Sequence, residues 1–187
     1  MRGLLIFRRS APAEDFESIA LPYLNDLYRT ATRVIGNRTE AEDLVQEAYL
    51  QAWKSFHRFE PGTNCRAWLF KILFHVIQHH RRKWHSSKTV QESEDLLFQD
   101  SITYEPPVPQ DLSDEEVLAA LEKVAVQYRE VVLLADVQEF SYKEISATLG
   151  IPVGTVMSRL SRGRTFLRVE LSNFAEGYGI SGKGKSA

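Results

Sequence analysis

The 187 residues suit one or two domains, and an apolar fraction of 43% is sufficient for buried cores. A single cysteine, Cys65, excludes an internal disulfide and a cysteine-based zinc site. The apolar run at residues 4–7 is too short for the core of a signal peptide, and no stretch approaches the ~20 apolar residues of a membrane span. We therefore expect a soluble, cytoplasmic protein without membrane insertion.

The formal net charge of -2 hides an uneven distribution of charge along the chain. Residues 61–90 contain six basic side chains and no acidic one, whereas residues 91–116 contain nine acidic side chains and no basic one. Such blocks indicate basic surfaces separated by an acidic connector.

Residues 1–13 are predicted to form a flexible arm before the first helix. Apolar residues recur at helical spacing from Phe16 to Val34, which predicts an amphipathic helix that stops at Gly36. Pro22 would kink this helix or delay its start.

A second helix is predicted from Thr39 to about Ser55. Thr39 and Glu42 form a capping-box pattern, and the acidic residues of the first turn suit the positive end of the helix dipole. The expected buried stripe consists of Leu44, Val45, Ala48, Tyr49 and Ala52.

A third helix, rich in aromatic and basic residues, is predicted from Cys65 to about Trp84, with Asn64 as its N-cap. Basic side chains neutralise phosphates, and exposed aromatic rings stack on bases that have left a duplex. This helix and the loop before it are therefore candidates for nucleic-acid binding. Some of its aromatic rings must instead form the core, and for Trp68 both interpretations stay open. The candidate contacts on the helix are Arg66, Trp68, Lys71, Phe74, Gln78, Arg81 and Arg82.

All five histidines fall within residues 57–85. His75 and His79 are four residues apart on one helix, a spacing that can bind zinc, but no nearby carboxylate or cysteine completes a site. We interpret the histidines as phosphate-facing or solvated, and we predict no metal and no cofactor.

Residues 86–112 lack periodicity, are acidic, and contain a proline-rich segment at 106–109, which predicts a flexible, partly extended linker. Ser113 and Glu116 form a capping box that begins a fourth helix. A fifth helix is predicted to end before Gln138.

Residues 140–168 have the pattern of a helix-turn-helix. Ser141 and Glu144 predict the start of its first helix, and Gly150 predicts a left-handed end. Pro152 then falls in the first turn of a second helix that is basic and contains no acidic residue up to residue 168. This spacing favours a helix that enters a DNA major groove, although a helical hairpin in an ordinary bundle is the alternative.

The pattern contains no strand and no internal repeat, so the predicted fold class is all-α. Two small helical bundles, residues 14–85 and 113–172, are joined by a flexible acidic linker at 86–112. A disordered tail is expected at 173–187.

Two stretches together resemble extracytoplasmic-function (ECF) sigma factors of the sigma-70 family. Residues 40–84 are similar to sigma region 2 and residues 121–168 to sigma region 4. The resemblance is carried by the motifs AEDLVQE (41–47), RAWL (66–69) and GTVMSR (154–159).

The resemblance implies a dissociable initiation subunit of bacterial RNA polymerase, without catalysis of its own, that commonly has an anti-sigma partner. In this family the helix matching residues 43–53 docks on the clamp of the large catalytic subunit. The implied docking residues are Asp43, Leu44, Gln46, Glu47, Gln51 and Trp53.

The same resemblance implies two contacts with promoter DNA. The loop and helix matching residues 59–84 would open the −10 element and hold a flipped base, which adds Phe59 and Asn64 to the candidates named above. The recognition helix would read the −35 element through Thr155, Ser158, Arg159, Arg162 and Arg164. Met157 stands where some relatives carry arginine, which weakens the case for direct base readout at that position.

Two other functions fit part of the pattern. A stand-alone helix-turn-helix regulator, binding duplex DNA as a dimer, explains residues 140–168 but leaves the basic aromatic helix without a role. A metal-dependent nuclease or hydrolase would use His75 and His79. We expect a sigma factor that binds core polymerase and promoter DNA, and not an enzyme.

Overall fold

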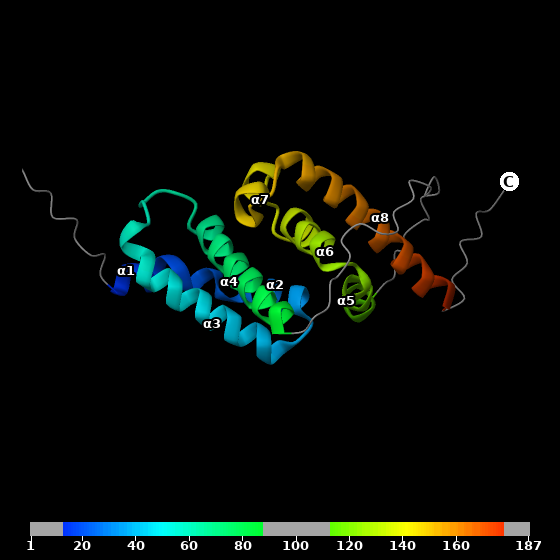
Figure 1. The fold of residues 1–187 in the computed structure, drawn as a ribbon, viewed down its shortest axis with the longest axis horizontal. Helices are drawn as coiled ribbons and strands as arrows, with labels where there is room; N and C mark the ends of the chain where they lie inside the picture. The colour runs from blue at the N-terminus through cyan, green and yellow to red at the C-terminus, as the bar shows by residue number, and fades with distance from the viewer. Residues whose placement is uncertain (1–12, 88–112, 178–187) are drawn as a thin grey trace, which may run out of the picture. The chain divides into compact units, whose positions relative to one another are not determined.

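The computed structural model describes residues 13–87 and 113–177, and all regular elements within these ranges are helical (Figure 1). The chain divides into two compact units, Met1–Lys83 and Trp84–Ala187. The all-α prediction is confirmed. The predicted arm and linker fall almost entirely outside the described residues, whereas the predicted tail begins too early, because helix α8 continues to Gly177.

The first unit begins with a helix that is interrupted at proline. Helix α1 (Ala13–Ala20) is followed by the 3-10 helix η1 (Leu21–Tyr23) and by α2 (Leu24–Ile35). Pro22 lies within η1, since its ring permits the first turn of a helix but not the interior of a long one. The sequence therefore predicted this interruption correctly.

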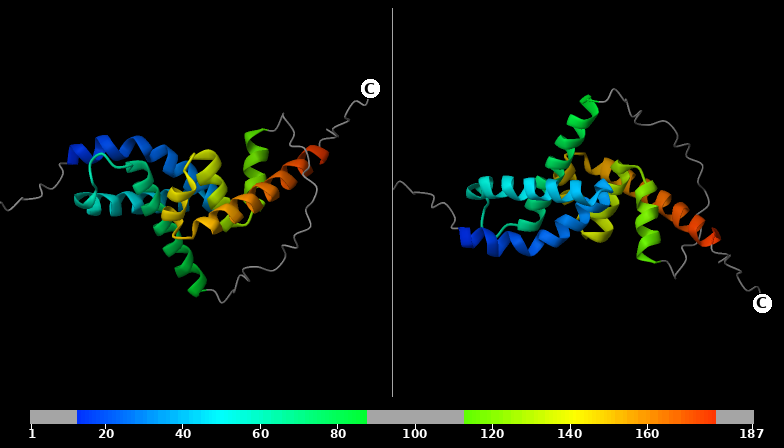
Figure 2. Two further views of the ribbon diagram at one scale, coloured as in Figure 1. Left: turned by 90° about the horizontal axis from the view of Figure 1, so that it is seen from above. Right: turned by 90° about the horizontal axis from the view of Figure 1, so that it is seen from below.

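Helix α3 (Arg38–Ser55) lies beside α2 and runs antiparallel to it (Figure 2). Gly36, with φ of 80°, ends α2 in the left-handed conformation that glycine adopts easily. Asn37 is the N-cap of α3, and its side chain accepts a hydrogen bond from the Glu40 amide at 3.1 Å. The predicted cap at Thr39 is wrong, because the tight turn after Gly36 starts the helix two residues earlier.

The short helix η2 (Phe56–Arg58) and a loop lead into α4 (Cys65–Ser87). Asn64 Oδ1 accepts a hydrogen bond from the Ala67 amide at 3.0 Å, which confirms the predicted N-cap. One face of α4 supplies much of the core of this unit through Leu69, Phe70, Leu73, Phe74 and Ile77, which are all buried.

The second unit contains α5 (Asp114–Lys123), α6 (Val126–Val132), a π-helical turn η3 (Leu133–Val137), α7 (Tyr142–Leu149) and α8 (Val153–Gly177). The buried Arg129 joins α6 to the end of α5, since its guanidinium donates hydrogen bonds to the Val124 carbonyl at 2.9 and 3.2 Å. Arg129 thereby satisfies a carbonyl at the C-terminal end of α5.

Helix α8 packs closely on α6 at Gly163. A Cβ atom at this position would lie 2.6 Å from Val132 Cγ2 and 3.2 Å from the Tyr128 carbonyl oxygen. Only glycine permits this approach without a shift of the two helices.

The helix-turn-helix forms as predicted. Ser141 and Glu144 make a reciprocal capping box, and Gly150, with φ of 68°, ends α7 in the left-handed conformation. The Ser146 hydroxyl donates a hydrogen bond to the Ile151 carbonyl at 2.6 Å, which fixes the turn. Helix α8 begins directly after Pro152, whose carbonyl accepts from the Val156 amide at 3.0 Å, so Pro152 lies just before the first turn rather than within it.

Candidate nucleic-acid interface

Helix α4 carries a stripe of mainly polar and basic residues away from the centre of its core face. Residues that are three or four positions apart share one face of a helix. By this spacing the stripe consists of Trp68, Lys71, His75, Gln78 and Arg82, which we call the α4 stripe. Lys71, His75 and Arg82 are exposed, while Trp68 and Gln78 are half-buried. Arg82 Nε donates to the Gln78 carbonyl at 3.4 Å.

The predicted contact at Phe74 is wrong. Phe74 is 0% exposed and packs in the core, although it stands three residues after Lys71 and four before Gln78. His75, one residue later, is exposed and occupies the surface position. The 100° turn per residue decides the difference, and the position of the core was needed to fix the phase of the helix.

Phe59 and Trp68 belong to an aromatic cluster that ties the loop before α4 to the rest of the unit. Their ring centroids are 5.1 Å apart, and Phe59 also stacks on Phe56 at 5.7 Å with an interplanar angle of 8°. Phe56 is buried, whereas Phe59 and Trp68 remain partly exposed. One part of the Trp68 ring therefore packs within the cluster, and another part is accessible to solvent.

Arg66 makes contacts with other residues of the first unit. Its guanidinium lies 5.5 Å from the centroid of the Phe70 ring, and Nε is 3.8 Å from Asp26 Oδ2. The contact with Asp26 connects α4 to α2, so Arg66 has a structural role beside any contact with DNA. Arg81 is half-buried.

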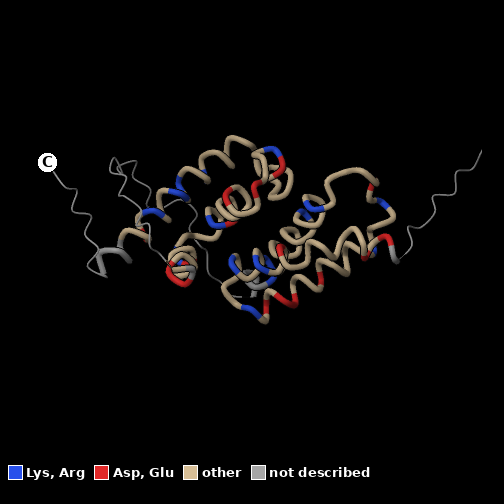
Figure 3. The backbone as a smooth tube through the Cα atoms, turned by 180° about the vertical axis from the view of Figure 1, so that it is seen from behind, with Lys and Arg blue, Asp and Glu red and all other residues tan. Residues whose placement is uncertain are grey.

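The exposed face of α3 combines carboxylates with large apolar side chains. Asp43, Gln46 and Glu47 are exposed, and Trp53 is 45% exposed although its ring edge packs on Phe16 at 5.2 Å. Leu50, 46% exposed, lies between them and was missed, although it follows Gln46 by four residues and precedes Trp53 by three. We call these five residues the α3 face. Figure 3 shows acidic residues spaced along this helix and basic residues toward the end of α4.

Two other predicted docking residues, Leu44 and Gln51, do not belong to the α3 face. Leu44 is buried, as its place in the expected stripe predicted, so the docking contact that the resemblance implied for Leu44 is wrong. Gln51 is half-buried and donates a hydrogen bond to Glu47 Oε1 at 2.9 Å.

Three histidines of α4 line a groove between α3 and α4. His75, His79 and His80 line it together with Glu47 and Gln51. His80 Nδ1 is 3.3 Å from Glu40 Oε1, which connects the two helices. Within residues 13–87 and 113–177, no three histidine, cysteine or acidic side chains come together as a metal site would require.

Cys65 lies at the start of α4 and is buried. Burial raises the pKa of its thiol to about 11. The thiol therefore stays protonated near neutral pH, and a protonated thiol is a poor nucleophile.

Helix α8, the predicted recognition helix, presents hydroxyl and cationic side chains along its exposed side. Ser158 and Arg162 are exposed, and Thr155 and Arg159 are half-buried. The Ser158 hydroxyl donates to the Thr155 carbonyl at 3.1 Å. Four of the five residues predicted for this contact are thus at least partly accessible on one side of the helix.

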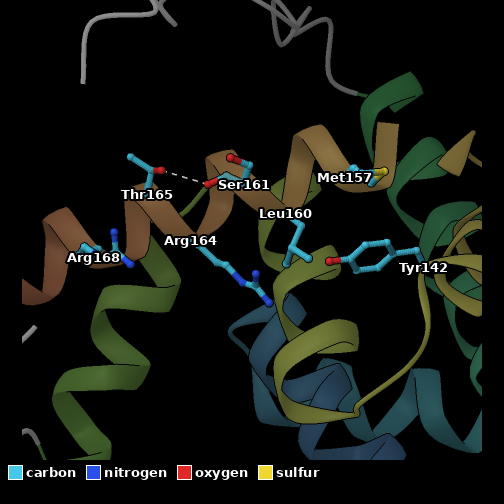
Figure 4. Close-up of a pocket in the computed structure, with 7 residues that line it drawn as sticks. All are labelled: Tyr142, Met157, Leu160, Ser161, Arg164, Thr165 and Arg168. Atoms are coloured by element: carbon cyan, nitrogen blue, oxygen red, sulfur yellow. Dashed lines mark hydrogen bonds between the residues drawn. The ribbon is translucent and has the colours of Figure 1, made fainter. Parts of the chain in front are cut away.

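Arg164, the fifth predicted residue, is held by an acidic partner. Its Nη2 and Nε atoms donate to the two carboxylate oxygens of Asp136 at 2.6 and 3.1 Å. The hydrogen bond to Asp136 raises the pKa of Arg164. Figure 4 shows the Arg164 side chain directed away from Ser161 and Thr165. Arg164 therefore fastens α8 to η3 in this structure.

None of the helices in the described parts of the chain has the combination of length and apolarity that a membrane span requires.

Both units match known protein families. Residues 19–86 match Sigma-70 region 2, and residues 114–167 match Sigma-70, region 4. The chain is 36% identical over 137 residues to the ECF RNA polymerase sigma factor EcfG of Rhodopseudomonas palustris, covering 73% of this chain and 74% of that protein. It is 32% identical over 163 residues to the ECF RNA polymerase sigma factor SigE of Mycolicibacterium smegmatis, covering 84% of this chain but only 62% of that longer relative.

A solved structure supports the same relationship. The sigma factor RpoE from Bartonella quintana, in complex with the anti-sigma factor NepR, matches with a TM-score of 0.69 and 31% identity. The match covers 85% of this chain and 98% of that chain.

Proposed function

The chain belongs to the ECF group of sigma-70 RNA polymerase sigma factors, and we propose that it directs bacterial core RNA polymerase to specific promoters through three separate surfaces. It is a regulatory protein, and we infer that it works in the cytoplasm without a catalytic step of its own. The observation that carries the proposal is the presence, in one chain, of a helix-turn-helix and of a partly exposed aromatic pair beside a basic stripe.

The α3 face supplies the contact with core polymerase. Leu50 and Trp53 offer exposed apolar area, and Asp43, Gln46 and Glu47 surround it with polar and acidic groups. Apolar anchors within a charged surrounding are typical of protein interfaces, where the anchors supply affinity and the charges supply orientation. The partner surface on the polymerase clamp would accordingly be basic around an apolar centre.

The α4 stripe and the Phe59–Trp68 pair act on the −10 element. Lys71 and Arg82 are placed to neutralise phosphates, and the exposed parts of the two aromatic rings can stack on a base that has left the duplex. An unstacked base that gains such a platform offsets part of the cost of melting. The main chain around Gly62, with φ of 88°, forms the turn that brings Phe59 beside Trp68.

The exposed side of α8 that carries Thr155, Ser158, Arg159 and Arg162 reads the −35 element. Each unit alone would bind DNA weakly. Core polymerase would fix the distance between them, so that binding at one element raises the effective concentration at the other.

We also propose an anti-sigma partner. The similar RpoE structure contains the anti-sigma factor NepR, and the α3 face offers an apolar and acidic surface that such a partner could cover. A candidate anti-sigma protein added at equimolar concentration should then suppress transcription and displace core polymerase.

In vitro transcription tests the proposal directly. Bacterial core polymerase, with and without this protein, is supplied with promoter fragments from a genomic library, and transcripts are mapped to their start sites. We expect defined start sites only with the protein present. No protein-dependent start site, combined with a footprint on a palindromic duplex in the absence of polymerase, would instead favour a stand-alone regulator.

Reversal of charge on the α3 face tests the docking surface. Asp43→Lys should weaken binding of the chain to core polymerase in a pull-down, because a lysine at this position would repel the basic groups expected around the apolar centre of the partner surface. Asp15→Lys, at an exposed acid on α1, is the matched control and should leave binding unchanged. Equal affinity of the Asp43 variant and the wild type would remove the docking assignment.

A further inference from the structure

The exposed surface of α8 has two edges of different chemistry. At 100° per residue, Thr155, Arg159 and Arg162 lie along one edge, and Val153 and Met157 lie along the other. Ser158 lies between the two edges. The first edge is cationic and the second is apolar.

The apolar edge is unusually open for side chains of this type. Met157 is 54% exposed, which is the largest value among the exposed large hydrophobic residues of the described chain, and Val153, one turn earlier, is 39% exposed. Val156 and Leu160, by contrast, are buried and hold α8 against its own unit. Packing within the unit therefore does not explain why an apolar side chain stands at the exposed position 157.

No arginine lies between Val153 and Met157 on this edge. The next arginine along the edge is Arg164, whose side chain is directed toward Asp136. Arg164, seven residues after Met157, is held by both carboxylate oxygens of Asp136. Figure 4 shows Met157 at the beginning of α8, with Arg164 pointing away toward the rest of the unit. The first turns of this edge thus present apolar atoms to whatever α8 contacts.

The major groove offers one apolar feature to such an edge, the 5-methyl group of thymine. The amino-terminal turns of a recognition helix are the part that approaches base edges. We propose that Met157, supported by Val153, contacts thymine methyl groups in the −35 element and so selects A·T pairs at that position. The inference rests on the proposed function, since it assumes that α8 enters the major groove of a promoter.

The test replaces thymine by uracil, which lacks only the methyl group. A promoter duplex is first selected from random sequences by the full chain assembled with bacterial core polymerase. Each thymine of its −35 element is then replaced singly by uracil, and the affinity of the assembled polymerase is measured. We expect about a fourfold loss at one or two thymines, the size expected for one buried methyl group.

Substitution of Met157 identifies the side chain responsible. Met157→Ala should bind the thymine and uracil duplexes equally at those positions, whereas Met157→Leu should keep the preference for thymine. Leu118→Ala is the matched control, because Leu118 is an exposed apolar residue on α5, and this variant should behave as the wild type.

Each other outcome overturns the inference in a distinguishable way. A wild type that binds the selected duplex but is indifferent to uracil, or a Met157→Ala variant that keeps the wild-type preference, overturns the methyl contact and leaves the proposed function intact. A Met157→Ala variant that loses affinity for core polymerase while keeping thymine preference assigns Met157 to a protein contact. Failure to select any duplex overturns the proposed function, and the inference with it.

Discussion

Helices α4 and α8 both carry a nucleic-acid surface, but they relate to their cores in different ways. In α8 all the predicted contacts except Arg164 lie away from the core, because Val156, Leu160 and Gly163 hold one side of the helix against its unit. In α4 the aromatic residues are divided, since Phe70 and Phe74 are core whereas Trp68 is shared between core and surface. A polar or cationic contact is therefore easier to assign from sequence than an aromatic one, because only the aromatic side chain is equally suited to both environments.

The largest effect is expected from a substitution that tests which residues of α4 belong to the core. Phe74→Ala should lower the free energy of unfolding of the first unit by about 3–5 kcal/mol, because it leaves a cavity in the core. Denaturant unfolding of the full chain measures this change. His75→Ala, at the neighbouring exposed position, should change stability by less than about 0.5 kcal/mol. Equal stability of the two variants would contradict the assignment of Phe74 to the core.

The second prediction tests how closely α8 packs on α6. Gly163→Ala should destabilise the second unit by about 1–3 kcal/mol, because the new Cβ would lie 2.6 Å from Val132 Cγ2. Without that contact, alanine in a helix would stabilise by about 1 kcal/mol. Gly154→Ala provides this control, since no atom lies within 4 Å of the position of its Cβ. Thermal unfolding should move in opposite directions for the two variants.

The third prediction concerns the cationic edge of α8. Arg162→Ala should weaken binding to the −35 element and lower transcription from promoters that depend on it. The slope of log affinity against log salt should fall by about one, because one cationic contact is lost. Run-off transcription at several salt concentrations measures both effects. Unchanged transcription and slope would exclude Arg162 from the interface, whereas Arg29→Ala, at an exposed arginine on α2, should leave the −35 contact unchanged.

The smallest effect is expected for the Arg164–Asp136 pair. Both side chains are partly exposed, so their coupling should contribute only about 0.2–1 kcal/mol in a double-mutant cycle. The cycle combines Arg164→Ala and Asp136→Ala, with unfolding as the measurement. If Arg164→Ala instead weakens DNA binding by the same amount in the presence and absence of Asp136, Arg164 contacts DNA rather than fastening α8.

Much of the local structure could be predicted because short-range chemistry determines it. The capping boxes at Ser113 and Ser141, the left-handed Gly150 and the interruption at Pro22 all depend on residues within one turn. The prediction at Thr39 failed for the same kind of reason, since Asn37 is an equally good cap and stands immediately after Gly36.

Prediction of the candidate site was less accurate for apolar and aromatic residues than for polar ones. Its polar and cationic members were proposed from charge blocks and helical spacing, as for Lys71, or from the resemblance, as for Arg162, and both of these side chains are exposed. Leu50 was missed because an exposed leucine has no chemical signature. Phe74 was named as a contact although it is buried, and so was Leu44, which the helical spacing had placed in the buried stripe and only the resemblance had placed at the docking surface. In each of these cases the residue type permits both environments, so the packing of neighbouring helices decides.

The sequence by itself determined the helical fold, the helix-turn-helix and the family of this protein, because periodicity, caps and turn residues act over a few positions. Only the tertiary structure decided which side of each helix is accessible. It buried Phe74 and exposed His75, paired Arg164 with Asp136, and left Met157 open on α8. These outcomes depend on contacts between residues distant in sequence, which the order of residues along a single helix does not specify.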